Sequence, residues 1–409
     1  MIAVGVITNK LAINELTFYN SIMTLCFFAE MFGFGFIEGF GIYINQNINN
    51  PEKSKKYARI GFCWISIFAF LFVLILCLFP NFIIKKLLGL TFEVNLTFYY
   101  LMVIGIFFSA LLYYIMDLMK KVTLFKFQMI CSIIQCALIF SGLILLTVSN
   151  NLVLILIGIT YLATYLICLV VGLLLLNKNK VYNVNLFKIS SLKLTKSETG
   201  IILTRTMSEL VWEVGFTFIS LFILNSNVTT YNQYCYFENA LDILGGFLFA
   251  FFNVVSIKIC RCIGNGEKKE ALNHAKNSII STFVLWLFYA VVSLSCFIPL
   301  QKGLNPELQN TAFVSLLLYV ALAFFRYIDW NLGTYIIGQS EVYAKTSLII
   351  ETCGMFFWIA MYLVSTQVSM NIFLIYSIIA FESIVKIVIN SIFIFKQKWL
   401  NKIDEFSVH

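Results

Sequence analysis

Apolar residues occur along this chain in long runs, each close to the length that a membrane-spanning helix requires. An α-helix needs about 20 apolar residues to cross the roughly 30 Å hydrocarbon core of a bilayer. Strands of a membrane barrel would alternate apolar and polar residues, and these runs do not alternate. The runs predict an all-α integral membrane protein with about eleven full transmembrane helices, at residues 16–47, 60–84, 94–117, 124–148, 151–177, 200–224, 233–260, 277–300, 310–337, 343–366 and 370–395.

The loops between these spans alternate in charge. Cytoplasmic loops of membrane proteins carry an excess of lysine and arginine. One set of alternate loops is basic and contains Lys53, Lys55, Lys56, Arg59, Lys120, Lys121, Lys126, Lys178, Lys180, Lys188, Lys193, Lys196, Arg261, Lys268, Lys269, Lys276, Lys345, Lys396, Lys398 and Lys402. The other set contains only Lys10, Lys85, Lys86 and Lys302. The asymmetry predicts a multi-pass protein of the cell membrane with a cytoplasmic C-terminus.

Composition supports a chain embedded in the lipid bilayer. Charged residues make up 12% of the chain and hydrophobic residues 60%, whereas soluble domains carry about 25% charged residues. The net charge of +8 is explained by anionic lipid and requires no nucleic-acid partner. The two histidines, His274 and His409, fall in a loop and a tail, which argues against histidine catalysis or a haem. Cys260 and Cys262 form a CxC that lacks the second ligand pair of a zinc site.

The two parts of the chain on either side of the polar segment 178–199 resemble each other. Residues 44–53 align with residues 259–268, and Phe107-Phe108 aligns with Phe324-Phe325 at nearly the same offset. Parallel repeats are typical of transporters, with the binding site between the repeats. We therefore predict two homologous six-helix bundles. The boundaries are an N-terminal bundle at 1–177, a cytoplasmic linker at 178–199, a C-terminal bundle at 200–396 and a cytoplasmic tail at 397–409.

The repeat also concerns the start of the sequence. The span at 200–224 should have a counterpart that ends near residue 8. Residues 1–9 are apolar and match only the last third of such a helix. We therefore expect the first bundle to be incomplete, with the sequence beginning inside its first helix.

Two carboxylates within the predicted spans are the main candidates for a functional site. Charges at membrane depth cost several kcal/mol and usually face a cavity or a partner. Glu213 has no cation one helical turn away, and Asp329 has Arg326 three residues before it, which could neutralise it. A carboxylate at this depth can bind and release a proton, or ligate Na⁺ through its oxygens.

Other ionisable residues in the spans allow a structural interpretation. Arg205 and Glu209 are four residues apart, as are Glu382 and Lys386, and this spacing on a helix favours ion pairs. The glycines at 33, 35, 39 and 41 favour close contact between helices over substrate binding.

Three short motifs resemble the MATE (multidrug and toxic compound extrusion) family. The segment Trp212-Glu213-Val214 is similar to the seventh helix of the NorM-like branch, in which the glutamate belongs to a cation site. Residues 328–340 resemble the tenth helix, whose aspartate belongs to the same site; here it is Asp329. The loop 264–271 resembles the turn after helix eight. The first-half counterpart of this turn has Asn49 and Pro51 in place of the family glycines.

The resemblance implies a function. Two bundles would form a V around a central cavity, and alternating access would export small organic compounds, cationic or amphipathic, in exchange for Na⁺ or H⁺. Glu213 and Asp329 would bind the cation, as a proton or a possible Na⁺, with Glu209, Asp242, Arg326 and Arg205 as polar partners in the cavity. The protein would be a monomer that is not an enzyme and uses no cofactor. The family's carboxylate in helix one would fall before Met1.

Three alternatives remain open at this stage. A lipid-linked oligosaccharide flippase of the same superfamily would have a cationic cavity, which Arg205 and Arg326 fit modestly. A membrane prenyl transferase or acyl transferase would require paired DxxxD motifs or a buried histidine, and the sequence contains neither. An inactive membrane scaffold would follow from loss of the first helix.

Overall fold

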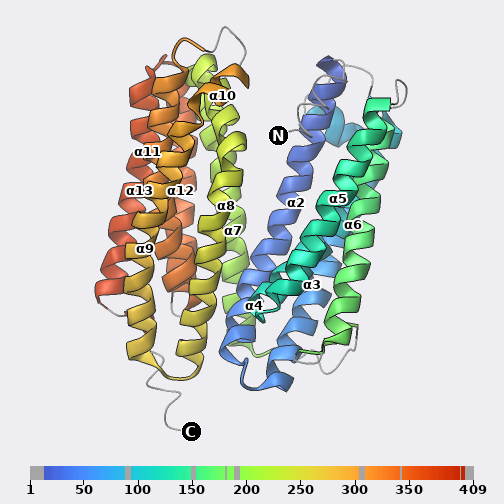
Figure 1. Ribbon diagram of the computed structural model, residues 1–409, viewed down its shortest axis with the longest axis vertical. Coiled ribbons are helices and arrows are strands. Elements are labelled where there is room, and N and C mark those ends of the chain that lie inside the picture. The colour runs from blue at the N-terminus through green and yellow to red at the C-terminus, as the bar shows by residue number, and fades with distance from the viewer. Residues whose placement is uncertain are drawn as a thin grey trace. The chain divides into compact units, whose positions relative to one another are not determined.

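A computed structural model describes residues 13–87, 94–148, 153–179, 182–187, 194–303, 309–340, 343–396 and 398–400. Eleven long helices lie in these ranges (Figure 1). They are α2 (Ile13–Gln46), α3 (Pro51–Leu78), α4 (Leu96–Lys121), α5 (Phe125–Val148), α6 (Val153–Lys178), α7 (Lys196–Ser226), α8 (Val228–Gly264), α9 (Lys268–Ser295), α11 (Ala312–Trp330), α12 (Ala344–Ser365) and α13 (Ile372–Phe395). The apolar stub 1–9 lies outside the described residues.

Short helical turns complete the described part of the chain. They are the π-helical turns η1 (Phe82–Leu87) and η3 (Asn331–Ile336), the helix α10 (Phe297–Gly303), and the 3₁₀ turns η4 (Ile337–Gln339) and η5 (Lys398–Leu400). These ranges contain no β-strand, so the predicted all-α class is confirmed. Ten of the described helices, α3 to α9 and α11 to α13, are long and apolar enough to cross a membrane.

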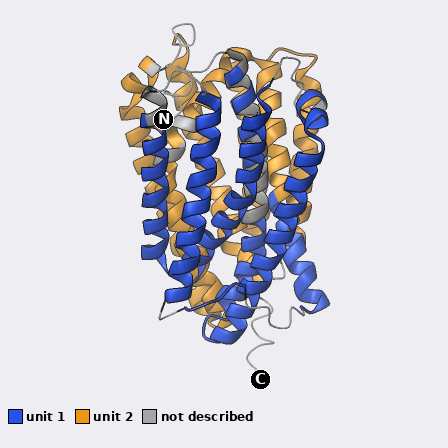
Figure 2. Ribbon diagram, turned by 90° about the vertical axis from the view of Figure 1, so that its right-hand side faces the viewer, with its two compact units in different colours: residues 1–209 blue, residues 210–409 orange. Residues whose placement is uncertain are grey.

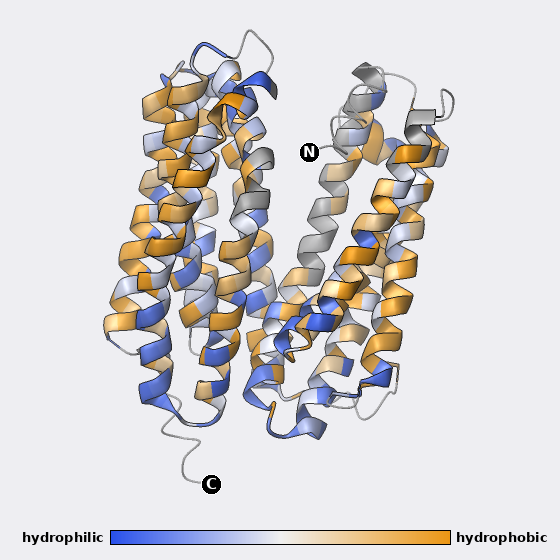
Figure 3. Ribbon diagram, viewed as in Figure 1, coloured by the Kyte–Doolittle hydropathy of each residue, from blue (hydrophilic) through white to orange (hydrophobic). Residues whose placement is uncertain are grey.

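Several helices begin earlier than their apolar runs. α3 begins at Pro51 and not at residue 60, and α9 begins at Lys268 and not at residue 277. At α3 the side chain of Asn50 accepts a hydrogen bond from the Lys53 amide at 3.3 Å, and Pro51 occupies the first helical position, where its missing N–H costs nothing. Hydropathy locates only the apolar stretch of a helix, so it missed these polar first turns. Figure 3 shows hydrophilic residues in the first turns of α9 and mostly hydrophobic residues beyond them.

The chain divides into two compact units, Met1–Glu209 and Leu210–His409, with the division inside α7 (Figure 2). In the first unit α4 packs against α2, α3 and α6. α2 also approaches the first part of α7 closely at two glycines. A Cβ on Gly39 would lie 2.9 Å from the carbonyl oxygen of Ile202, and one on Gly35 would lie 3.2 Å from that of Thr206. The close helix contact that the glycine series predicted is present at these two positions.

Part of the segment that joins α6 to α7 packs against α3. The hydroxyls of Tyr182 and Ser54 lie 2.9 Å apart, and Arg59 Nε donates to the carbonyl oxygen of Asn185 at 3.2 Å. Burial raises the pKa of Tyr182 to about 12, because a phenolate there would lose its hydration. Tyr182 is therefore a neutral hydrogen-bonding group at physiological pH.

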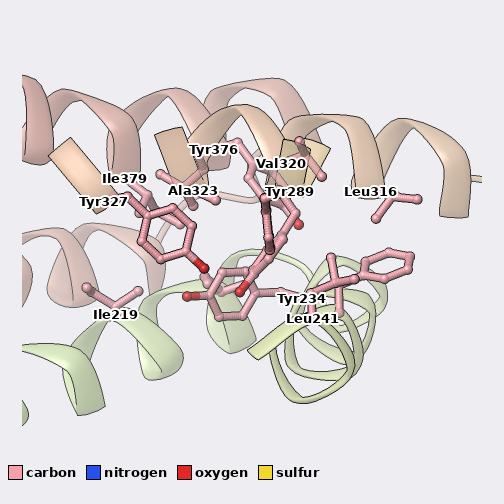
Figure 4. Packing of buried hydrophobic residues seen from close by; sticks show 14 of the residues in the cluster. Ile219, Tyr234, Leu241, Tyr289, Leu316, Val320, Ala323, Tyr327, Tyr376 and Ile379 are labelled. Atoms are coloured by element: carbon pink, nitrogen blue, oxygen red, sulfur yellow. The ribbon is translucent and has the colours of Figure 1, made fainter. Parts of the chain in front are cut away.

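The second unit has an aromatic core. Figure 4 shows the rings of Tyr234, Tyr289, Tyr327 and Tyr376 close together between α8, α9, α11 and α13. The ring centroids of Tyr289 and Tyr327 are 5.5 Å apart, and those of Tyr234 and Tyr319 are 5.6 Å apart. Edge-on contacts of this kind add to the stability from burial. On the outside of the same unit, large apolar side chains such as Ile280, Val291 and Phe395 are exposed, as a lipid-facing surface requires.

Candidate functional site

Glu213 lies mid-way along α7 at the start of the second unit. Its side chain is buried, with 5% of its surface exposed, and Oε2 has no hydrogen-bond partner among the described residues. Its charged neighbour is Glu238 of α8, another carboxylate. An unpaired carboxylate oxygen inside the bundle is costly unless it binds a proton or a cation. Glu213 therefore has the environment expected of an ion-binding group.

Asp329 lies on α11, two residues before the π-helical turn η3 begins at Asn331. One of its oxygens accepts a hydrogen bond from Asn390 Nδ2 at 3.2 Å. The other end of the Asn390 amide accepts a hydrogen bond from the Tyr343 hydroxyl. A Cβ on Gly333 would lie 2.9 Å from Asn390 Nδ2, so this glycine leaves the space that the amide occupies. The chain Tyr343–Asn390–Asp329 holds the carboxylate in place.

Lys386 on α13 is the cation close to Asp329. Its ammonium lies 2.8 Å from Glu351 Oε2 and 2.6 Å from Glu382 Oε1, and it interacts electrostatically with Asp329. The pair of Glu382 and Lys386 that the sequence predicted is present. Glu351 of α12 is an additional partner that their spacing on one helix did not indicate.

Arg326 does not pair with Asp329, contrary to the neutralisation that their spacing allowed. Its guanidinium lies 3.5 Å from Glu238 Oε1, over the rings of Phe216 and Tyr234 at 5.8 Å and 5.6 Å from their centroids. Tyr234 also donates to Glu238 at 3.1 Å. A spacing of three residues puts Arg326 and Asp329 near one another along α11, but the nearby glutamate on α8 determines where the guanidinium points.

These groups surround a pocket within the second unit. Its charged lining consists of Arg326, Asp329, Glu351, Glu382 and Lys386, and its aromatic lining consists of Trp212, Phe216, Trp330 and Trp358. Asp329 and Arg326 thus reach the same pocket, whereas Glu213 is not among the residues that line it. The two carboxylates that the sequence singled out lie in the same unit but have different neighbours.

The other predicted partners lie elsewhere. Arg205 and Glu209 belong to the first unit and form the ion pair that their spacing predicted, at 2.5 Å. The side chain of Asp242 lies outside the described residues. In the first unit, a buried ion pair links Lys121 to Glu38 at 2.6 Å, so Lys121 is not the solvated loop cation that the loop pattern predicted.

The structure is similar to several solved transporters. The sequence matches no protein-family model and no curated protein significantly. A structure described as MATE in complex with MaL6 aligns with a TM-score of 0.78 over 99% of this chain and 92% of its own, at 10% identity. The MATE transporter ClbM in complex with Rb⁺ aligns with a TM-score of 0.69 over 94% of this chain and 88% of its own, at 13% identity. A MOP superfamily transporter from Pyrococcus furiosus, described as having a binding pocket of reverse polarity, aligns with a TM-score of 0.75 over 98% and 92%, at 10% identity.

The chain has the MATE transporter fold. The expected resemblance is thereby confirmed at the level of the fold, and two of the three neighbours are described as transporters. Within the MATE fold of this chain, the buried and half-buried charges of the second unit that are described above fall into three groups. These are Glu213, the Arg326–Glu238 pair, and the group of Asp329, Glu351, Glu382 and Lys386.

Sequence reasoning missed the role of Asn390 and of Glu351. Asn390 follows Lys386 by four residues, and Lys386 follows Glu382 by four, so the three share one face of α13. That polar stripe in an otherwise apolar span is the signal that could have identified the site. The partner residues on α11 and α12 could not be found in this way, because their proximity depends on how the helices of this MATE-fold unit pack.

A further cluster lies at the α8–α9 turn. Ligand atoms of Cys262, Glu267 and Glu270 lie within 4.8 Å of one another, with the cysteine buried and both glutamates exposed. Cys260 of the CxC is not part of it. Exposed acidic groups commonly gather without an ion, so this turn of the MATE fold is not assigned a metal.

Proposed function

We propose that the protein is a MATE-family transporter, of the multidrug/oligosaccharidyl-lipid/polysaccharide exporter superfamily, that exports small organic compounds in exchange for Na⁺ or H⁺. The compounds would be cationic or amphipathic, the protein would act as a monomer in the cell membrane, and its C-terminus would be cytoplasmic. The observation that carries the proposal is the burial of Glu213 and Asp329 within the second unit of a MATE fold. Carboxylates at this depth mark ion pathways in transporters.

In the proposed mechanism, each carboxylate binds the coupling ion in one conformation and releases it in another. An ion can drive a conformational change only if it binds one state more tightly than the other. Glu213, with an unpartnered oxygen, would bind a cation at low cost. Asp329 accepts a hydrogen bond from Asn390 and lines the pocket, so a change in its charge would act on the same space that a substrate would enter.

The proposal favours the exporter over the oligosaccharide-lipid flippase of the same superfamily. The flippase would have a cationic cavity to hold anionic phosphates. Here the buried Arg205 is paired with Glu209, and the half-buried Arg326 is paired with Glu238. The charged lining of the pocket contains three carboxylates and two cations, which supports a preference for positive substrates.

Transport of ethidium into inverted membrane vesicles, which corresponds to export from the cell, tests the proposal. Wild-type vesicles should accumulate ethidium when an ion gradient is imposed, and Glu213→Gln should abolish the accumulation while the protein remains in the membrane at wild-type levels. The matched control is Glu15→Gln, at the exposed start of α2, which should leave accumulation unchanged. Normal coupled efflux by the Glu213→Gln protein would remove Glu213 from the mechanism, and no efflux by the wild type would favour the inactive scaffold.

A further inference from the structure

Three carboxylates from three different helices of the second unit line one pocket together with one ammonium. Asp329 comes from α11, Glu351 from α12 and Glu382 from α13, and Lys386 contacts the two glutamates at 2.8 Å and 2.6 Å. The interaction with Asp329 is electrostatic. Lys386 is buried, with 6% of its surface exposed. A single buried positive charge thus lies among three acidic groups. We call Asp329, Glu351 and Glu382 the carboxylate cluster.

The other described charged residues near the pocket interact with Glu238 and not with Lys386 or its partners. Arg326 of α11 is directed to Glu238 of α8, and it is further held over the rings of Phe216 and Tyr234. Glu213 of α7 has Glu238 as its charged neighbour. Among the described residues, Lys386 is therefore the cation that neutralises the carboxylate cluster. Its charge is one, the same as that of Na⁺.

The space for this ammonium is provided by a glycine on the neighbouring helix. A Cβ on Gly354 of α12 would lie 2.9 Å from Glu382 Oε1 and 3.4 Å from Lys386 Nζ. Any larger residue would push the lysine and glutamate away from their present positions. The position of the ammonium between Glu351 and Glu382 thus depends on the absence of a side chain at Gly354 of α12.

We propose that Lys386 is a tethered cation that occupies the carboxylate cluster of Asp329, Glu351 and Glu382, so that this site excludes Na⁺. Na⁺ is a hard cation that needs several oxygen ligands at once. The ammonium has three N–H donors and already contacts one oxygen of Glu351 and one of Glu382, two of the oxygens that Na⁺ would require. This proposal rests on the proposed function and refines it: exchange at this site is limited to protons, which need no vacant coordination shell.

Binding of radiolabelled Na⁺ to the purified full-length chain in detergent tests the proposal without any transport step. The wild type should show no saturable Na⁺ binding that depends on Asp329. Lys386→Met removes the charge and keeps the bulk, so it should gain saturable Na⁺ binding, with about tenfold or more Na⁺ bound than the wild-type background at the same concentration. Adding Asp329→Asn should remove the gain. Lys345→Met, an exposed lysine at the start of α12, is the matched control and should behave as the wild type does. Lys386→Arg keeps the charge and should also bind no Na⁺.

Two results would overturn the proposal. One is saturable Na⁺ binding by the wild type that Asp329→Asn abolishes, and the other is a folded Lys386→Met protein that binds no Na⁺. Lys386→Gln is the second variant if Lys386→Met does not fold, with the same expectation and the same contrary outcome. If the wild type does not transport ethidium but the Na⁺-binding results are as expected, the proposed antiport is rejected and the role of Lys386 is supported. If the wild type transports ethidium normally but also binds Na⁺ through Asp329, the role of Lys386 is rejected and the proposed antiport is supported.

Discussion

At the scale of single residues, the structure separates buried charges by the partners that they have. Glu213 keeps one oxygen without a partner among the described residues, whereas Glu382 and Glu351 share the ammonium of Lys386. A buried charge whose partner is removed costs about 3–5 kcal/mol, while one that never had a partner has already incurred that cost in the native state. Neutralising a buried charge without a partner should therefore leave the stability unchanged or raise it, whereas neutralising a charge that has partners should lower it.

Neutralising Glu213 should not destabilise the protein. Glu213→Gln removes a buried charge that faces another carboxylate, Glu238, so the melting temperature in detergent should stay the same or rise. The measurement is thermal unfolding of the purified variant beside the wild type. A clear fall in melting temperature would show that the Glu213 carboxylate has a stabilising partner.

Removing Lys386 should destabilise the protein more than removing one of its partners. Lys386→Met leaves three carboxylates without a cation, at a cost of about 3–5 kcal/mol. Glu351→Gln leaves the ammonium with Glu382 and Asp329, so its melting temperature should fall by less. Added Na⁺ should raise the melting temperature of Lys386→Met and not that of the wild type, because a ligand stabilises the state that binds it. Equal losses in the two variants would contradict this order.

At the scale of helices, the first unit depends on close contacts at specific points. α2 meets α7 at Gly35 and Gly39, and the segment after α6 is fixed to α3 through Tyr182. Small residues at helix contacts allow backbones to approach closely, and in a membrane this packing supplies much of the attraction between helices. Changes at these points should affect stability even though they remove no charge.

Gly39→Ala should destabilise the first unit. The added Cβ would lie 2.9 Å from the Ile202 carbonyl oxygen and 3.2 Å from its Cα, both backbone atoms that can move only with the helix. Overpacking of this kind costs about 1–3 kcal/mol. Gly200→Ala on α7 is the control, because a Cβ there meets no atom within 4 Å and alanine favours the helix. A melting temperature of Gly39→Ala equal to that of Gly200→Ala would refute the close contact.

Tyr182 should make the first unit sensitive to alkaline pH. Its pKa is raised by burial from 10.0 to about 12, so its contribution to stability is complete below pH 10 and is lost as the pH rises through 12. That contribution is at most about 3 kcal/mol. Thermal unfolding between pH 9 and pH 12 should show a steeper decline for the wild type than for Tyr182→Phe. Parallel curves for the two proteins would show that Tyr182 is not titrating in this range.

At the scale of the whole molecule, the apolar runs predicted the all-α membrane fold class and the positions of the helices well. Each helix that crosses a bilayer needs a continuous apolar stretch of its own, and such a stretch is visible in the sequence without knowledge of the packing. Eleven runs correspond to eleven long helices in the described ranges. The candidate site was predicted less completely. Glu213 and Asp329 stood out as charges in apolar segments, but the direction of Arg326 toward Glu238 and the contact of Lys386 with Glu351 depend on packing between helices. Spacing in the sequence predicts ion pairs within one helix, such as Glu382–Lys386, but it does not predict ion pairs between residues of different helices.

In the proposed mechanism, substrate export and ion entry are coupled in one protein. Proteoliposomes that contain the purified chain, ethidium and a fluorescent pH indicator in the lumen measure this coupling directly. An outward ethidium gradient, with no ion gradient imposed, should drive the coupling ion inward in wild-type liposomes, seen as acidification of the lumen for H⁺ or as uptake of radiolabelled Na⁺ for Na⁺. Glu213→Gln should abolish that entry. Ethidium loss from wild-type liposomes with neither a change in luminal pH nor uptake of Na⁺ would overturn the proposal.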